Sequence, residues 1–289
     1  MSYIGRFAPS PSGPLHLGSL VAALGSYFQA KSNKGKWLVR IEDLDPPREV
    51  PGSNKTILQA LEAYCLHWDG EVLYQSNRHD VYQEQINQWL KTGQAYYCQC
   101  TRKQIKASGG YYLGTCRDKH IDNSTNCSVR LLVSNYVPSF VDLSQGDIAI
   151  PEPLVKEDFI IKRRDGLFAY NLAVVMDDIE QGVTEVVRGA DLIEPTGRQI
   201  SLYKTLEQKP VSYLHLPLVV DASGNKLSKQ NHAKAISITE PKPDLISAMQ
   251  ILGFTLDDDL QSATIEELIN WGCEHWSVKQ LPKSIEVTS

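Results

Sequence analysis

Long hydrophobic runs are missing from this chain. Apolar residues make up 42% of its 289 residues. The longest strictly apolar runs, such as residues 172–176, fall far short of the ~20 residues that a membrane helix needs. The first residues, Met-Ser-Tyr-Ile-Gly-Arg-Phe, contain no basic segment followed by an apolar one, which is the pattern of a secretory signal. We therefore expect a cytoplasmic protein that does not contact a membrane.

The chain also lacks a strong excess of charge of either sign. Lys plus Arg total 29 and Asp plus Glu total 34, which gives a formal net charge of −5. A protein that binds nucleic acid through bulk charge is usually basic, so RNA binding would need a local basic patch. One segment contains five cations and a single acid, Asp118. The cations are Arg102, Lys103, Lys106, Arg117 and Lys119. A solvated loop would show the same charges.

The cysteines are too scattered for a small disulfide scaffold. Three of the six cluster, because Cys98 and Cys100 flank one residue and Cys116 follows a Gly-rich turn. Thiolates favour zinc, which takes four tetrahedral ligands. The candidates for a fourth ligand are Tyr112, His120 and Cys127. Three reduced thiols without a metal are the alternative.

The order of predicted elements favours an α/β fold with a doubly wound, Rossmann-like parallel sheet. Strand-like segments at 3–8 and 37–41 alternate with helical patterns that begin near Leu17 and Ser53, and such an order is typical of this sheet. Ser53 is the expected N-cap of its helix. The α/β pattern resumes after an interruption, at 158–162.

We divide the chain into four regions. Residues 1–70 form the first half of the Rossmann-like domain, and 159–233 form the second half. The interruption at 71–158 is an insertion that carries the cysteine cluster. Residues 234–289 form a small helical region, in which one helix is expected to end at Gly272.

The loop after the first strand predicts a phosphate-binding site. Prolines and a glycine at 9–14 break the strand, and a helix begins at His16. The N-terminus of a helix offers N–H groups and the positive end of the dipole, which bind anions. Gly18 allows close approach, and His16 can donate to a phosphate oxygen. A capping loop with a surface histidine is the alternative.

A second basic motif, Lys226-Leu-Ser-Lys229, follows a Gly-Asn turn. Its two lysines, with Ser228 between them, can hold phosphates as point charges. A lysine-rich surface turn has the same composition. Phosphoryl and nucleotidyl transfer need positioning and charge stabilisation, which His16 and these lysines would supply together.

Several motifs in order resemble those of class I glutamyl-tRNA synthetases. Residues 6–19, RFAPSPSGPLHLGS, resemble the HIGH region of that family, and residues 226–230, KLSKQ, resemble its KMSKS loop with Gln230 in place of Ser. The other matching motifs lie at 40–45, 66–69, 97–101, 170–178 and 187–191. The resemblance implies the catalytic-domain fold of a class I synthetase, with a zinc-bearing insertion, across residues 3–235.

This resemblance implies an ATP-dependent ligase that makes glutamyl-adenylate. Its catalytic residues would be His16 and Lys229. The implied binding residues for ATP, which enters with Mg, are His16, Gly18, Lys226, Ser228 and Lys229. The implied binding residues for L-glutamate are Arg6, Phe7, Ala8, Pro9, Ser10, Glu42, Tyr170 and Arg188.

The chemistry of glutamate agrees with this set, because its two carboxylates need cations and its ammonium needs an acid. Arg6 and Arg188 can pair with carboxylates. Glu42 can hold the ammonium, and Tyr170 can hydrogen-bond a carboxylate. An ordinary ion pair at the sheet edge is the alternative for Glu42 and Arg188.

The zinc motif of the family, Cys-x-Cys followed by Tyr and Cys, matches Cys98, Cys100, Tyr112 and Cys116. It implies one structural zinc ion. Residues 234–289 are too few for the anticodon-binding region of a full-length glutamyl-tRNA synthetase, so we expect that region to be lacking. The resemblance then implies the truncated branch of the family, whose members activate glutamate without tRNA. They attach it to queuosine at the wobble position of tRNA(Asp).

The expected partners are L-glutamate, ATP and queuosine-containing tRNA(Asp), and we expect a monomer. Other hypotheses are conventional charging of a tRNA 3′ end, a nucleotidyltransferase that acts on a small metabolite, and a non-catalytic RNA-binding relic. The glutamate-pocket motifs argue against the small metabolite. Intact His16, Lys226 and Lys229 argue against the relic.

Overall fold

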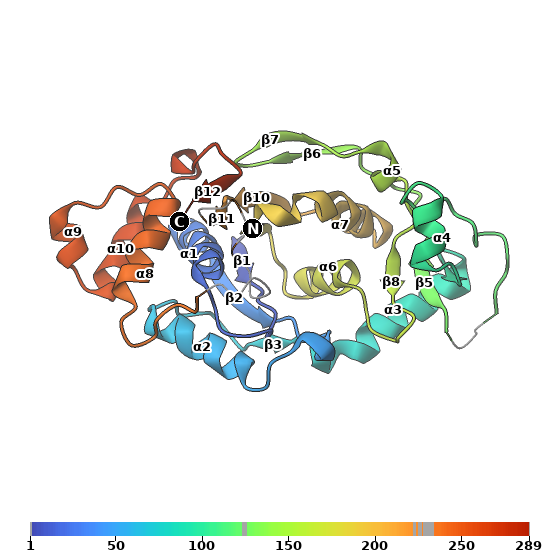
Figure 1. The fold of residues 1–289 in the computed structure, drawn as a ribbon, viewed down its shortest axis with the longest axis horizontal. Coiled ribbons are helices and arrows are strands. Elements are labelled where there is room, and N and C mark those ends of the chain that lie inside the picture. The colour runs from blue at the N-terminus through green and yellow to red at the C-terminus, as the bar shows by residue number, and fades with distance from the viewer. Residues whose placement is uncertain (1, 123–125, 222–223, 225–226, 228–233, 289) are drawn as a thin grey trace.

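The computed structural model describes residues 2–288 except 123–125, 222–223, 225–226 and 228–233. Figure 1 shows an elongated arrangement, with the C-terminal helices at one end, a parallel sheet in the middle and the cysteine-bearing segment at the other end. None of the helices in the described ranges is long and apolar enough to cross a membrane.

The first half of the central sheet consists of three parallel strands. Strand β1 (Ile4–Phe7) pairs with β2 (Lys36–Ile41), which pairs with β3 (Leu73–Tyr74). Helix α1 (Leu17–Ser32) connects β1 to β2, and α2 (Ser53–Ala63) precedes β3. This order confirms the predicted strand–helix alternation.

The second half continues the sheet on the other side of β1. Thr184 donates its N–H to the Ile4 carbonyl at 2.9 Å, which brings β9 (Glu185–Gly189) beside β1. Strand β10 (Ser212–Leu216) pairs parallel to β9. The two helices that accompany these strands are α6 (Tyr170–Glu180) and α7 (Ile193–Thr205). The predicted doubly wound parallel sheet is therefore confirmed.

Helix α1 lies at the centre of the main hydrophobic core. Its Leu20, Leu24 and Phe28 are fully buried. A Cβ at Gly25 would lie 2.4 Å from Leu216 Cδ1, so glycine is what lets the helix lie directly against β10. This packing fixes the N-terminus of α1 at the carboxyl ends of the parallel strands, where α/β proteins bind ligands.

The insertion builds an antiparallel sheet together with residues 160–162, which the predicted division assigns to the second half of the Rossmann-like domain. Strand β5 (Ser128–Leu131) pairs with both β4 (Ala95–Cys98) and β8 (Ile160–Lys162). Helix α3 (His79–Thr92) leads into β4, and α4 (Arg102–Ala107) follows it.

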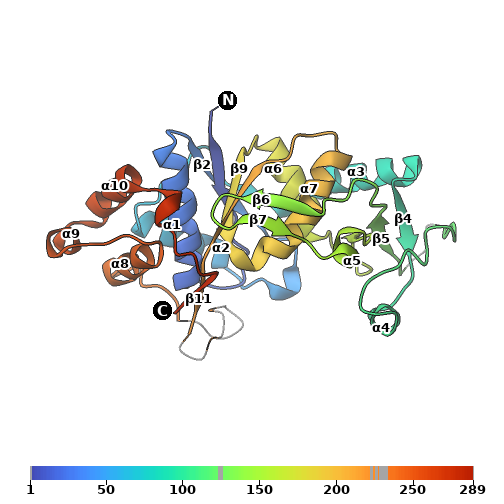
Figure 2. The same cartoon turned by 90° about the horizontal axis from the view of Figure 1, so that it is seen from above.

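A hairpin from the insertion also joins the central sheet. Strand β6 (Ser139–Asp142) pairs antiparallel with β7 (Gly146–Ala149) and parallel with β10, and Figure 2 shows the two strands of this hairpin lying side by side. A short helix, α5 (Glu152–Val155), follows it. The insertion therefore supplies residues to the edge of the sheet that carries the site.

The C-terminal region contains more than the predicted helices. It contains helices, α8 (Lys242–Ile251), α9 (Asp258–Ser262) and α10 (Ile265–His275), but it also ends in a strand, β12 (Glu286–Thr288), which pairs with β11 (Leu218–Val220).

Two predictions about the end residues of helices were wrong. Gly272 does not end a helix but lies inside α10, where a Cβ would come 2.7 Å from the Phe28 ring. The N-cap of α2 is Gly52 in a left-handed conformation, not Ser53. The Ser53 hydroxyl instead donates to the Gly13 carbonyl at 2.7 Å and accepts from the Gly13 N–H at 3.0 Å. Ser53 therefore anchors the loop before α1.

Candidate active site

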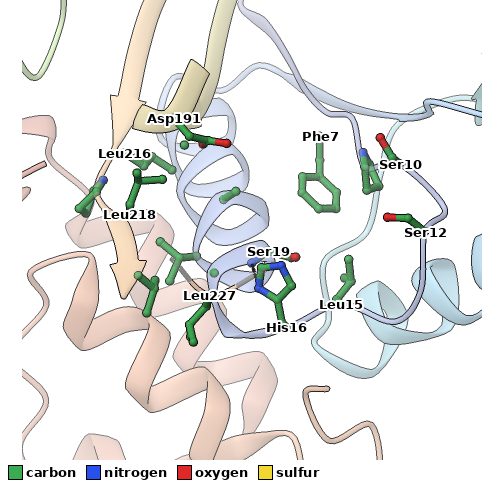
Figure 3. Close-up of a pocket in the computed structure, with 17 residues that line it drawn as sticks. Phe7, Ser10, Ser12, Leu15, His16, Ser19, Asp191, Leu216, Leu218 and Leu227 are labelled. Carbon is green, nitrogen blue, oxygen red and sulfur yellow. Dashed lines mark hydrogen bonds between the residues drawn. The ribbon is translucent and has the colours of Figure 1, made fainter. Parts of the chain in front are cut away.

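A cavity of about 420 Å³ lies at the N-terminus of α1. In Figure 3, Phe7, Ser10 and Ser12 line one side of it, and Asp191, Leu216 and Leu218 line the other. The remaining lining residues are Pro9, Leu15, His16, Gly18, Ser19, Val21, Ala22, Gly189, Pro217, Val219 and Leu227. The cavity brings together five predicted residues of the 6–19 motif, Phe7, Pro9, Ser10, His16 and Gly18, with the ends of β9 and β10.

His16 is the N-cap of α1. Its Nδ1 accepts a hydrogen bond from the Ser19 N–H at 3.3 Å. Because Nδ1 accepts, a neutral ring carries its proton on Nε2, which makes that nitrogen a donor. A Cβ at Gly18 would lie 3.2 Å from the His16 ring, so glycine leaves room for this ring beside the helix. The arrangement suits a phosphate at the helix N-terminus.

The predicted lysine motif falls on Lys226, Ser228 and Lys229, which lie outside the described residues. Leu227, the residue between them that is described, lines the cavity and donates its N–H to the Val219 carbonyl at 2.9 Å. At the far end of the segment, Ile236 donates its N–H to the Leu15 carbonyl at 3.0 Å. The chain that carries the motif therefore leaves β11 and returns beside the start of α1.

Arg6 lies in β1 with 3% of its surface exposed. Its Nε donates to Asp178 Oδ1 of α6 at 3.1 Å. Within the described residues its terminal nitrogens make no hydrogen bond. The position of Arg6 is thus fixed through Nε, and its two terminal nitrogens are available to a carboxylate.

Glu42 follows the end of β2. Arg40 Nη2 lies 3.5 Å from its Oε1, and the side chain is 10% exposed. Burial raises the pKa of Glu42, and Arg40 and Arg6 oppose this effect. Glu42 also lines a second cavity, of about 240 Å³, together with Ser10 and Ser12. Ser10 and Ser12 line both cavities, so Glu42 lies next to the cavity at α1.

Arg188 lies in β9, and all five of its N–H groups have partners. Nε donates to His215, and Nη2 donates to the Leu192 carbonyl and to Thr196. Nη1 donates to Gln199 at 2.8 Å and to the Tyr170 hydroxyl at 3.3 Å. Tyr170 is 36% exposed, so the bond to Tyr170 is the one on the open side. A carboxylate would reach Arg188 from there, by accepting the Nη1–H that the Tyr170 hydroxyl accepts at 3.3 Å.

Of the other predicted residues, Phe7 and Pro9 line the cavity at α1, whereas Ala8 does not. Sequence reasoning did not select Asp191 or the Leu216–Val219 backbone as lining residues. Asp191 belongs to the 187–191 motif and follows the end of β9, which was the available signal. Nothing in the sequence pointed to Leu216–Val219.

The cysteine cluster is assembled as predicted. The sulfur atoms of Cys98, Cys100 and Cys116 all lie within 4.8 Å of one another. The Tyr112 hydroxyl accepts from the Cys116 N–H at 2.8 Å. Among the described residues, neither His120 nor Cys127 belongs to the cluster. Three soft donors at this spacing fit zinc, and these cysteines with Tyr112 would hold it.

The surroundings of the cluster affect the charge of its thiols. Burial, with the neighbouring Cys116 thiol, raises the pKa of Cys100 to about 11, so a metal is what would make it a thiolate at neutral pH. Arg130 donates Nε–H to Cys98 Sγ at 3.3 Å, and its guanidinium lies 3.8 Å from the centre of the Tyr112 ring.

The basic segment next to the cluster is smaller than predicted. Arg117 is 41% exposed, but it makes a bidentate ion pair with Asp158, at 2.6 and 2.9 Å, which offsets its charge. The other four cations are exposed and make no ion pair among the described residues: Arg102, Lys103, Lys106 and Lys119.

The family model for the catalytic domain of class I tRNA synthetases (E and Q) matches residues 4–287. The chain belongs to this family. The predicted resemblance is thus confirmed, and with it a class I synthetase catalytic domain.

Curated relatives match the chain over nearly its full length. Glutamyl-Q tRNA(Asp) synthetase of Vibrio cholerae serotype O1 is 68% identical over 288 residues, which is 100% of this chain and 95% of that protein. The protein of the same name from Escherichia coli (strain K12) is 55% identical, across 99% of this chain and 93% of that one.

Among solved structures, glutamate-tRNA synthetase from Elizabethkingia anophelis superposes with a TM-score of 0.79 and 26% identity. The match covers 98% of this chain and 67% of that chain.

Proposed function

We propose that this protein activates L-glutamate with ATP, without tRNA, and transfers the glutamyl group to the queuosine base of tRNA(Asp). The relatives at 55% and 68% identity carry the name glutamyl-Q tRNA(Asp) synthetase and match this chain almost end to end. The observation that carries the proposal is the arrangement around Ser10. A cavity at a helix N-terminus lies on one side of it, and the Glu42 carboxylate lies on the other.

In the first step a glutamate carboxylate oxygen attacks the α-phosphorus of ATP, and pyrophosphate leaves. Negative charge grows on the phosphoryl oxygens during this displacement. His16 Nε2, the N–H groups at the start of α1 and Lys229 stabilise that charge, with Mg carried in by ATP. Asp191, at the other side of the cavity, offers a carboxylate acceptor to ribose hydroxyls.

Recognition of glutamate uses the charges around β1, β2 and β9. The terminal nitrogens of Arg6 pair with one carboxylate, and Glu42 holds the ammonium. Arg188 and Tyr170 hold the remaining carboxylate oxygens on the open side of the pocket. Loop contacts complete the glutamate site, and they come from Phe7, Ala8, Pro9 and Ser10.

In the second step a hydroxyl of the cyclopentenediol of queuosine attacks the activated carbonyl. The C–O bond of the new ester forms, and the bond between the carbonyl carbon and the phosphate oxygen breaks. AMP leaves with that electron pair, and its phosphate accepts the proton of the attacking hydroxyl. A base in an anticodon loop can be splayed out toward a protein site, which makes this acceptor reachable. The exposed cations near α4 would hold the RNA backbone in a salt-sensitive way. We place the reaction in the cytoplasm, where tRNA is found, and propose a monomer with a structural zinc ion.

Two measurements test the two steps. Glutamate-dependent exchange between ATP and pyrophosphate, without RNA, tests the first, and Lys229→Ala should lower its rate by ~10²–10³. Labelled glutamate offered to tRNA(Asp) from cells able and unable to make queuosine tests the second. We expect labelling of the queuosine-containing preparation alone. Equal labelling of both, or efficient labelling of tRNA(Glu), would contradict the proposed acceptor.

A further inference from the structure

Three buried side chains connect the inserted hairpin to the proposed glutamate pocket. His215 Nδ1 lies 2.6 Å from Asp142 Oδ2, and Arg188 donates its Nε–H to His215 Nε2 at 3.1 Å. The side chains of Asp142 and His215 are both 0% exposed. Asp142 ends β6, His215 lies in β10 and Arg188 lies in β9, so the three cross three adjacent strands of the sheet.

The surroundings of Asp142 keep it a pure acceptor. Its Oδ1 accepts from the Ser144 and Gln145 N–H groups, both at 3.0 Å, and from the Ser144 hydroxyl at 2.9 Å. Its Oδ2 also accepts from the His215 backbone N–H at 3.1 Å. A carboxylate with this many donors stays ionised, and the pKa of Asp142 is lowered although burial opposes the shift.

These contacts allow one state of the His215 ring. Asp142 accepts, so Nδ1 must donate, and an arginine Nε always donates, so Nε2 must accept. The ring is therefore neutral with its proton on Nδ1. Burial lowers the pKa of His215, which agrees with this state, although Asp142 opposes the effect. Tyr213 stacks on the ring with centroids 6.1 Å apart, and Phe140 packs beside it.

We propose that Asp142 and His215 are positioning residues for glutamate recognition by Arg188. This inference rests on the proposed function, because it takes Arg188 as a glutamate ligand. His215 holds the Nε edge of the guanidinium, and Thr196 and the Leu192 carbonyl hold Nη2. With both edges held, the plane of the group is fixed and Nη1 faces Tyr170 on the open side. The inserted hairpin thus contributes to substrate binding without touching substrate.

The test uses variants that separate the two hydrogen bonds of the His215 ring, one to Asp142 and one to Arg188. His215→Asn keeps a donor near Nδ1 but has no atom at the position of Nε2, whereas His215→Gln can place an amide oxygen there. Asp142→Asn turns an amide N–H toward His215, because the Asn oxygen remains held by the Ser144 and Gln145 N–H groups. The ring then takes the other tautomer and points an N–H at Arg188.

We expect His215→Asn and Asp142→Asn to raise KM for glutamate in the exchange reaction about 10-fold, which corresponds to the loss of one bond to a charged group. KM for ATP should stay within about 2-fold. His215→Gln should recover most of the loss. Nitrogen NMR of the wild-type protein should show His215 protonated on Nδ1 and unprotonated on Nε2, which is a readout that does not need a folded variant.

Tyr64→Phe is the control for a general loss of stability. It removes part-buried hydrogen bonds to the Ser237 carbonyl and Asp244, neither of which contacts Asp142, His215 or Arg188. It should lower Tm and leave KM for glutamate unchanged. Exchange with an unshifted KM in Asp142→Asn, or a proton on Nε2 in the wild type, overturns this inference alone. A wild-type protein without glutamate-dependent exchange overturns the proposed function, and this inference with it.

Discussion

Arg6 and Asp178 form a buried ion pair at 3.1 Å that joins β1 to α6. Asp178 Oδ1 also accepts from Arg40 Nη1 of β2 at 2.7 Å, so one carboxylate serves two guanidinium groups on neighbouring strands. The side chains of Arg6 and Asp178 are each 4% exposed. The helix thereby fixes Arg6 through Nε and leaves its terminal nitrogens for the proposed glutamate carboxylate.

We predict that Asp178→Asn lowers the free energy of unfolding by about 3 kcal/mol, because removing one partner leaves buried cations uncompensated. KM for glutamate should rise as well, since Arg6 loses its fixed position. Denaturant titration measures the first effect and exchange kinetics the second. Glu152→Gln, which breaks the exposed pair with Lys156, is the control and should change neither. Equal stability losses in the two variants would contradict the prediction.

The same pair predicts a pH dependence of stability. Burial would raise the pKa of Asp178, but Arg40 and Arg6 outweigh it and hold that pKa below the ordinary value of ~3.9. A group with a depressed folded-state pKa stabilises the fold above its unfolded-state pKa and loses that contribution as pH falls through the folded-state pKa. The stability difference between wild type and Asp178→Asn should therefore be full at pH values above ~4 and shrink below this. Urea titrations across this range measure it, and a constant difference would be the contrary result.

The roles of His16 can be separated by substitution. His16 caps α1 through Nδ1, and we assign phosphate contact to Nε2. Asn is a strong N-cap residue but is too short to replace Nε2, so His16→Asn should keep Tm near that of the wild type. Exchange should fall by ~10²-fold, the usual effect of removing one donor to a developing negative charge. His16→Ala, which loses both functions, should lower Tm and exchange together. Unchanged exchange in His16→Asn would remove the ring from the reaction.

Local patterns predicted much of the central sheet. The strand–helix alternation from β1 to α2 and the helix α6 follow from apolar spacing, which a chain segment carries by itself. Residues around the cavity, such as His16 and Gly18, were predictable because the N-terminus of a helix that follows a Pro/Gly loop binds anions.

Contacts distant in the sequence could not be predicted in this way. Asp142 meets His215 across 73 positions, and no periodicity encodes which strand a hairpin will join. Arg117 was counted in the basic patch without its partner, because Asp158 lies 41 positions away. Gly272 matched the pattern of a helix end, but its actual role is to admit the Phe28 ring. Each of these depends on packing, which overrides local preference.

The last prediction concerns the metal. If the cluster of Cys98, Cys100 and Cys116 with Tyr112 binds zinc, then Cys98→Ser removes one of three soft ligands, and bound zinc per chain should fall well below one. Because a structural ion would hold the insertion together, its loss should loosen residues 98–119. These residues should then be cut more readily by protease. Transfer to RNA should suffer more than exchange, because the cavity at α1 is built from other strands.

Cys127→Ser is the matched control, since Cys127 lies close in sequence but outside the cluster. It should keep its zinc, whereas Tyr112→Phe should bind zinc more weakly if the hydroxyl is the fourth ligand. Elemental analysis of protein purified without chelators gives the metal content, and limited proteolysis reports the loosening. Wild-type protein without zinc would mean that the three sulfur atoms lie together as thiols. Zinc loss in Cys127→Ser with retention in Tyr112→Phe would move the fourth ligand from Tyr112 to Cys127.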